Sequence, residues 1–232
     1  MEVIILAGGL GTRLQGVIGQ YPKCMAAVNG RPFLAYLFDY LGTQGCTRVI
    51  LSLGYKHEVI LEWLAQQTPP FVVDHVVEQE PMGTGGGIQL AIKDAVSDHV
   101  IVLNGDTMFM ADLRAQMEYH RSMHAGTTLG LKKMYAFDRY GIVVTNDHGR
   151  ITSFEEKQYR EEGMINAGVY IVDTRHYLGK QLPAKHSFEK AYLERYTMEG
   201  RFYGFESEAY FIDIGIPVDY EKAQQDLKII FS

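Results

Sequence analysis

The chain has 232 residues, of which 47% are hydrophobic and 22% charged, an ordinary composition for a folded globular domain and unlike that of a disordered chain. Two cysteines, Cys24 and Cys46, are too few for a disulfide framework or a cysteine-built zinc site. The 22 basic and 28 acidic residues give a net charge of −6, which argues against general binding of nucleic acid. The apolar run at residues 3–7 is too short for a signal peptide or a membrane span, so we expect a cytoplasmic protein without membrane contact.

The first 106 residues are predicted to alternate between strands and helices. Continuous aliphatic runs, such as residues 3–6, are typical of strands that a parallel sheet buries on both faces. Apolar residues at helical spacing follow them. Strands are expected at residues 3–6, 48–53, 71–77 and 99–103, and helices at 32–40, 57–66 and 87–96. This order predicts parallel βαβ units and an α/β fold with a doubly wound, mostly parallel sheet.

The second half of the chain is predicted to be mixed. Strands are expected at residues 127–133, 142–145, 151–154, 165–172, 201–205 and 209–212, with helices at 188–196 and from Pro217 onward. The sequence Asn146-Asp147-His148-Gly149 indicates a hairpin turn between two of these strands. We expect one domain over 1–232, with halves at 1–110 and 111–232. The helix near Phe188 is expected in the core, although the sequence leaves open whether it instead forms the interface of a homo-oligomer.

A glycine-rich loop, Gly8-Gly9-Leu10-Gly11-Thr12-Arg13, follows the first predicted strand. Glycines allow a backbone to approach a ligand closely, and their amides can bind phosphate oxygens. Leu14 breaks the dinucleotide fingerprint, which weakens an oxidoreductase interpretation, and the lysine of a Walker A loop is absent. Arg13 and Lys23 could clamp a triphosphate from both sides of the loop, whereas a tight turn and a surface lysine are the structural alternatives.

Several short motifs occur in a fixed order along the chain: residues 6–14 (LAGGLGTRL), Pro22-Lys23, 80–86 (EPMGTGG), 104–106 (NGD), 155–157 (EEK), 166–168 (NAG) and 211–215 (FIDIG). With these motifs the sequence resembles the sugar-1-phosphate nucleotidyltransferases. The resemblance covers nearly the whole chain. Within this family, residues 213–220 (DIGIPVDY) are most similar to the D-glycero-D-manno-heptose 1-phosphate guanylyltransferases.

The resemblance implies that a sugar 1-phosphate oxygen attacks the α-phosphorus of a nucleoside triphosphate, releasing pyrophosphate and forming a nucleotide sugar. Because the attacking phosphate is already anionic, no protein nucleophile is needed, and catalysis consists mainly of alignment and charge neutralisation. The first half then becomes the nucleotide-binding half and the second the sugar-phosphate-binding half.

The resemblance also assigns residues. The catalytic residues are Arg13, Lys23 and Asp106, and the metal ligands for Mg²⁺ are Asp106 and Asp213. The nucleotide-binding residues are Leu6, Ala7, Gly8, Gly9, Gly11, Thr12, Arg13, Glu78, Gly83 and Thr84. The sugar-phosphate-binding residues are Gly141, Glu156, Lys157 and Asn166. The alternative for either aspartate is a turn or helix-capping role, and for residues 155–157 it is an exposed, charged hairpin end.

Glu78 favours GTP as the nucleotide. Guanine presents two adjacent N–H donors that one carboxylate can accept together, whereas uracil and thymine suit an amide. Relatives that use UTP or dTTP commonly carry Gln at the place of Glu78, although Gln79 and Glu80 lie close enough to keep the choice open. We expect transfer of GMP to D-glycero-D-manno-heptose 1-phosphate, the alternatives being mannose 1-phosphate with GTP, or aminosugar or hexose 1-phosphates with UTP or dTTP. A non-catalytic nucleotide-sugar sensor is less favoured because all the expected charged residues are present.

Overall fold

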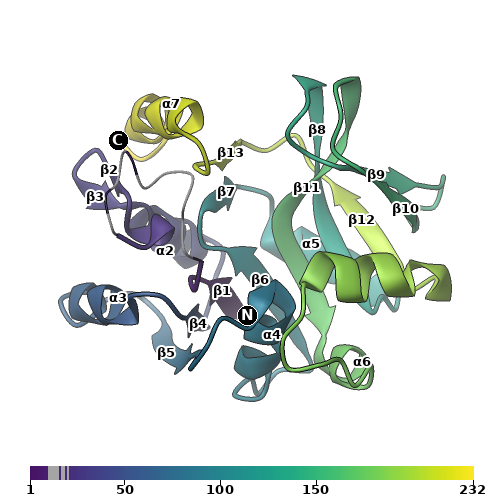
Figure 1. The fold of residues 1–232 in the computed structure, drawn as a ribbon, viewed down its shortest axis with the longest axis horizontal. Helices are drawn as coiled ribbons and strands as arrows, with labels where there is room; N and C mark the ends of the chain where they lie inside the picture. The colour runs from purple at the N-terminus through teal and green to yellow at the C-terminus, as the bar shows by residue number, and fades with distance from the viewer. Residues whose placement is uncertain (10–15, 17–18, 20) are drawn as a thin grey trace.

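A computed structural model describes residues 1–9, 16, 19 and 21–232 of the chain (Figure 1). At its centre lie four parallel strands: β1 (Glu2–Leu6), β4 (Arg48–Leu53), β5 (Val72–Val77) and β6 (His99–Asn104). They are arranged in the order β6-β1-β4-β5, so the direction of strand addition reverses beside β1. Open sheets of this kind bind ligands at the carboxyl ends of the strands near such a reversal.

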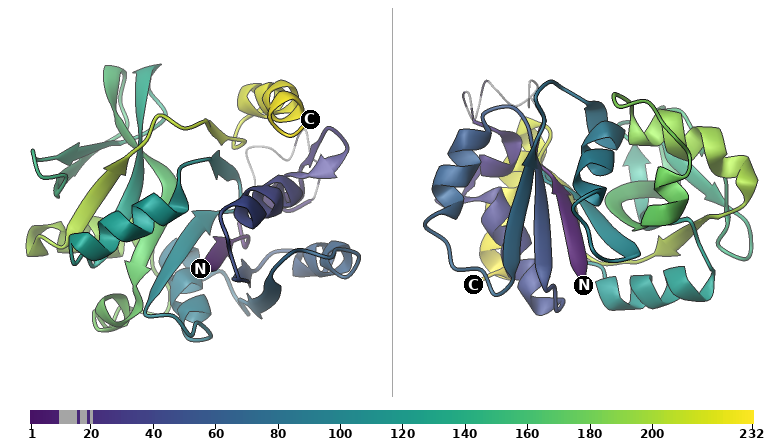
Figure 2. Two further views of the ribbon diagram at one scale, coloured as in Figure 1. Left: turned by 180° about the vertical axis from the view of Figure 1, so that it is seen from behind. Right: turned by 90° about the horizontal axis from the view of Figure 1, so that it is seen from below.

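Helices cover both faces of this sheet, as the right-hand view in Figure 2 shows. Residues Val3, Ile4 and Ile5 of β1 are fully buried because both faces are covered, which explains the continuous aliphatic run. The helices α2 (Phe33–Thr43), α3 (His57–Leu64), α5 (Leu113–Ser122) and α7 (Pro217–Ile230) pack into one apolar core, and α4 (Gly83–Ile92) packs into the other. The predicted doubly wound fold is confirmed.

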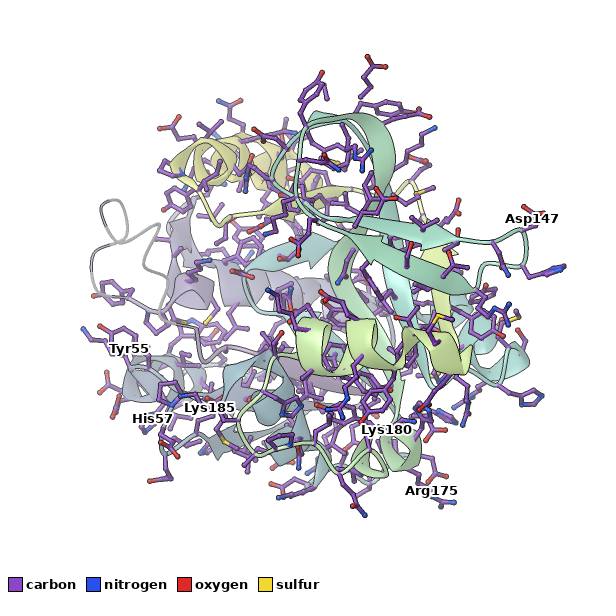
Figure 3. All side chains as sticks on the ribbon, turned by 45° about the vertical axis from the view of Figure 1, so that its right-hand side comes forward. Tyr55, His57, Asp147, Arg175, Lys180 and Lys185 are labelled. Carbon is purple, nitrogen blue, oxygen red and sulfur yellow. The ribbon has the colours of Figure 1, made fainter. Side chains whose placement is uncertain are left out.

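The second half of the chain extends the sheet with antiparallel strands. The long β11 (Arg160–Asp173) runs antiparallel to β6 and to β8 (Thr127–Phe137), and β12 (Phe202–Glu206) is parallel to β8. The predicted hairpin is present, with β9 (Ile142–Thr145) paired to β10 (Ile151–Glu155). Its turn projects outward at Asp147 (Figure 3).

Several short elements were not predicted. They are the hairpin of β2 (Ala27–Val28) and β3 (Arg31–Pro32), the strand β7 (Thr107–Phe109), the helices α5 and α6 (Thr174–Leu178), and the 3₁₀ turns η2 (Lys23–Met25) and η4 (Thr197–Glu199).

Two expected helices differ in detail. The helix expected at 87–96 begins at Gly83 instead, so the glycine cluster forms its first turns and does not precede it. The helix expected at 188–196 contains a π-helical stretch, η3 (Glu189–Glu194), and Phe188 is buried in the core as expected. No helix among the described residues is long and apolar enough to cross a membrane.

Candidate active site

A cavity of about 410 Å³ lies at the carboxyl ends of β1, β4 and β6. Nine of the residues expected to bind nucleotide or act in catalysis line it: Leu6, Ala7, Gly8, Gly9, Lys23, Glu78, Gly83, Thr84 and Asp106. The three other expected residues, Gly11, Thr12 and Arg13, lie outside the described residues. Residues far apart in the sequence therefore converge on one cavity, as the family motifs require.

Glu78 enters this cavity from the end of β5. Its Oε2 accepts a hydrogen bond of 2.9 Å from the backbone N–H of Met82, which fixes the orientation of the carboxylate. Burial raises the pKa of the Glu78 carboxyl, and the Met82 hydrogen bond opposes this rise. Gln79 and Glu80 are exposed, and neither is among the described residues that line the cavity. The geometry thus favours Glu78 over both neighbours as the side chain available to a bound base.

Asp106 lines the same cavity. The backbone N–H of Gly105 donates to the carbonyl of Leu6 (2.9 Å), which joins the turn after β6 to the end of β1. A Cβ at position 105 would lie 2.6 Å from that carbonyl oxygen, so only glycine permits this close approach. The Asp106 carboxylate then forms an ion pair of 2.8 Å with the Lys23 ammonium.

Asp213 is brought to Asp106 by pairing of two three-residue strands, β7 and β13 (Phe211–Asp213). The N–H of Ile214 donates to the carbonyl of Asp106 at 3.0 Å. Burial and then the nearby Asp106 carboxylate raise the pKa of Asp213, while the N–H of Gly215, Lys23 and Arg139 lower it. The two carboxylates therefore repel each other across the place where residues 1–110 meet residues 111–232, which we call the seam.

This donor set suits a hard divalent cation. Among the described residues no group of three or more His, Cys, Asp or Glu side chains could hold a metal ion. Mg²⁺ is commonly held by one or two carboxylates, and its other ligands come from water and substrate phosphates. The residues present, Asp106 and Asp213, fit that requirement.

A second cavity, of about 610 Å³, adjoins the first. All four residues expected to bind the sugar phosphate line it: Gly141, Glu156, Lys157 and Asn166. The Asn166 amide is held in place, since it donates to the Tyr170 hydroxyl (2.9 Å) and accepts from the N–H of Gly168 (3.0 Å). A register irregularity in β11 directly after Asn166 permits this local turn.

Sequence reasoning missed several residues that line the second cavity: Arg139, Tyr140, Ser187, Glu189, Lys190 and Glu194. Arg139 forms ion pairs with Asp219 and, at 3.9 Å, with Asp213. Its position directly before Tyr140-Gly141, whose glycine was already expected in the site, was the available signal. The residues at 187–194 gave no such signal, because their sequence indicated only a helix.

The two cavities meet at Asn104, which lines both of them. Asp106 lines the first cavity and Asp213 the second, so the carboxylate pair stands where ligands from the two sides would meet. Such an arrangement can bring two anionic ligands into contact and neutralise their charge.

Comparison with known proteins agrees with this geometry. A family model described as nucleotidyl transferase matches residues 2–229. The chain belongs to the nucleotidyl transferase family. This confirms the family and the enzyme class expected from the sequence, and it overrules the dinucleotide-dependent oxidoreductase alternative. Members of this family typically use a divalent metal.

Two curated relatives match almost end to end. The chain is 48% identical over 228 residues to a D-glycero-alpha-D-manno-heptose 1-phosphate guanylyltransferase of Aneurinibacillus thermoaerophilus, covering 98% of this chain and 99% of the relative. It is 42% identical to the protein of the same name from Campylobacter jejuni, and the match covers 95% of this chain and 97% of that relative. The crystal structure of HddC from Yersinia pseudotuberculosis complexed with GMP-PN superposes with a TM-score of 0.87 at 39% identity, and the match covers 97% of this chain and 99% of the HddC chain.

Proposed function

We propose that this protein transfers GMP from GTP to D-glycero-α-D-manno-heptose 1-phosphate, with Mg²⁺, releasing pyrophosphate and forming a GDP-sugar. The observation that carries the proposal is the meeting of two cavities at the Asp106–Asp213 carboxylate pair. Two near-full-length relatives bear the name of this activity, and a similar structure was solved with a guanine nucleotide analogue.

The two halves of the chain would divide the substrates between them. The first cavity is lined by residues between Leu6 and Asp106, all within residues 1–110, and would hold the nucleotide. The second is lined mostly by residues from the second half, 111–232, and would hold the sugar phosphate. The reaction then takes place at the seam between the halves, and we infer a cytoplasmic location, as expected from the sequence.

In this mechanism the protein aligns the substrates and neutralises their charge. Asp106 and Asp213 would hold Mg²⁺, which supplies a positive charge to the triphosphate oxygens where negative charge develops. Lys23 pairs with Asp106 in the free protein and would contact phosphate oxygens beside it. Arg13, from the glycine-rich loop, would act on the same triphosphate. No side chain has to form a covalent intermediate, because the attacking sugar phosphate carries its own negative charge.

On the sugar side, Lys157 would bind the phosphate and hold the attacking oxygen in line with the α-phosphorus. Glu156 and the Asn166 amide would bind sugar hydroxyls, and the backbone at Gly141 would complete the pocket. On the nucleotide side, the fixed Glu78 carboxylate would accept both N–H donors of guanine.

The test is a substrate matrix with the purified protein and Mg²⁺. GTP, ATP, UTP and dTTP are each combined with heptose, mannose, glucose and N-acetylglucosamine 1-phosphates, and pyrophosphate release is measured. We expect the highest kcat/KM for GTP with the heptose 1-phosphate. A clear preference for mannose 1-phosphate would favour the second candidate, because mannose-1-phosphate guanylyltransferases are also relatives, at 31% identity in Mycobacterium tuberculosis. No pyrophosphate release with any pair would favour the sensor alternative.

A further inference from the structure

One wall of the sugar cavity has no role in the mechanism above. It is the segment 187–194, which contains η3 and contributes Ser187, Glu189, Lys190 and Glu194 to the cavity. In Figure 1 this segment belongs to the light-green helix in front of β11. π-Helical turns are rare and frequently occur at functional sites.

The start of this wall is fixed to the nucleotide half. Its Glu189 carboxylate accepts hydrogen bonds of 2.9 Å from both the Thr84 and the Ser187 hydroxyls. Thr84 Oγ1 in turn accepts from the N–H of Phe188, also at 2.9 Å. The backbone of residues 184–188 lies directly against α4, where glycines 85 and 86 leave room for it. Both hydrogen bonds end on Oε2 of Glu189, so this oxygen holds the wall beside Thr84, which lines the nucleotide cavity.

The other end of the wall is held by the core and not by the nucleotide-cavity residue Thr84. Tyr192 and Leu193 are fully buried and anchor the helix to the core. The segment that follows, η4, packs against β10, so the wall runs from α4 across to the hairpin side of the cavity. Glu194 lines the sugar cavity and Asp106 the nucleotide cavity, so Glu194 belongs to the part of the wall that leads toward the hairpin.

Lys190 and Glu194 are charged and exposed in this cavity wall, and within the described part of the chain neither side chain has an ion pair or hydrogen bond. A carboxylate accepts hydrogen bonds only, and an ammonium donates only, whereas a sugar hydroxyl can do both. The pair therefore matches a polyhydroxylated arm.

We propose that Glu194, with Lys190 beside it, selects the sugar by binding the exocyclic arm that distinguishes a heptose from a hexose. The inference rests on the proposed function. A heptose carries one more hydroxylated carbon than mannose, at the end remote from the phosphate. A site built to hydrogen-bond a hydroxyl discriminates strongly against the analogue that lacks it, because its polar groups are then left poorly paired.

The experiment compares heptose 1-phosphate with mannose 1-phosphate, both with GTP, in the wild type and in Glu194→Gln and Glu194→Ala. We expect the ratio of kcat/KM for heptose over mannose to fall by roughly tenfold in the glutamine variant and further in the alanine variant. Calorimetric titration without GTP should show the same order of affinities for heptose 1-phosphate. Glu118→Gln, on the exposed side of α5 outside both cavities, is the matched control and should keep the wild-type ratio.

The outcomes separate the two claims. If the wild type prefers heptose and both Glu194 variants keep that preference, or lose both sugars equally, the inference is wrong and the proposed function stands. If the wild type does not use the heptose substrate, the proposed function is wrong and the inference fails with it. Melting temperatures of the variants, expected to be unchanged because Glu194 is exposed, exclude unfolding as the cause.

Discussion

Gly86 gives a sharp test of how the two halves are joined. In an exposed helix, replacing glycine by alanine stabilises the folded state by up to ~1 kcal/mol. At Gly86 in α4 the new Cβ would instead lie 2.4 Å from the carbonyl oxygen of Ala184 and 2.6 Å from the Cβ of Met82. Overpacking of this kind costs about 1–3 kcal/mol. Because the obstacle is backbone, which cannot rotate away, we expect the clash to exceed the helix gain and Gly86→Ala to lose about 1–2 kcal/mol of stability.

Urea unfolding measures the free energy, and steady-state kinetics measures the effect on the site. If Ala184 and the wall behind it shift, KM for the sugar 1-phosphate should rise more than KM for GTP. Gly9→Ala is the matched control for stability, since a Cβ at Gly9 would meet nothing within 4 Å in the part of the chain that the structure describes, and it should change the unfolding free energy by less than ~0.5 kcal/mol. A Gly86→Ala protein as stable as the wild type, or more stable, would refute the close packing on which this reasoning depends.

Three further predictions concern single side chains. Asp106→Asn keeps the shape of the residue but removes a charge from the proposed Mg²⁺ site, so we expect kcat to fall roughly a hundredfold with an unchanged melting temperature. Glu78→Gln should lower the ratio of kcat/KM for GTP over UTP by roughly ten- to a hundredfold, because an amide donor would face a guanine donor; an unchanged ratio would mean that Glu78 does not read the base. Burial and the neighbouring His99 lower the pKa of His120 to about 3. Between about pH 6.5 and pH 3 the His120 imidazole is therefore protonated in the unfolded chain but neutral in the folded protein. Stability should therefore fall as the pH drops from about 6.5 toward 3; His120→Gln should flatten this dependence, and the exposed His124→Gln should leave it unchanged.

The parallel half of the fold was predictable because burial on both faces leaves a direct mark on the sequence. All four predicted strands of the first half, and the helices between them, are present. The aliphatic runs of β1, β4 and β6 mark mostly buried strands, whereas the less buried β5 is interrupted by Asp74 and His75. Helix α5 was not predicted, because two of its four buried positions, Gln116 and His120, are polar and interrupt the apolar stripe. The signal that could have revealed it is Asp112, whose carboxylate caps the first turn by accepting from two backbone N–H groups.

The glycine cluster at residues 83–87 shows a different limit. In the sequence it indicated a loop before a helix, because glycine is a poor helix former. In the structure these glycines lie inside α4, where Cβ atoms at Gly85 and Gly86 would collide with residues 184–188. Glycine is required at these positions because a segment about a hundred residues later in the chain packs against them, and a local sequence pattern cannot indicate such a contact. The wall residues Lys190 and Glu194 were hidden for a similar reason, since charges on one side of a helix ordinarily face solvent.

For the Asp106–Asp213 pair, the sequence could indicate the two residues but not their proximity. Each aspartate could be singled out locally, because each comes after a predicted strand and near a glycine, with Gly105 directly before Asp106 and Gly215 two residues after Asp213. Their proximity depends on β7 and β13, each only three residues long, and on one hydrogen bond from Ile214 to Asp106. Each carboxylate also lies near a cation from its own half of the chain, Lys23 beside Asp106 and Arg139 beside Asp213. Arg139 also pairs with Asp219, so this cluster of described residues holds three carboxylates and two cations. Binding of two anionic substrates there would require further positive charge, which is the physical reason to expect a divalent cation at the aspartates.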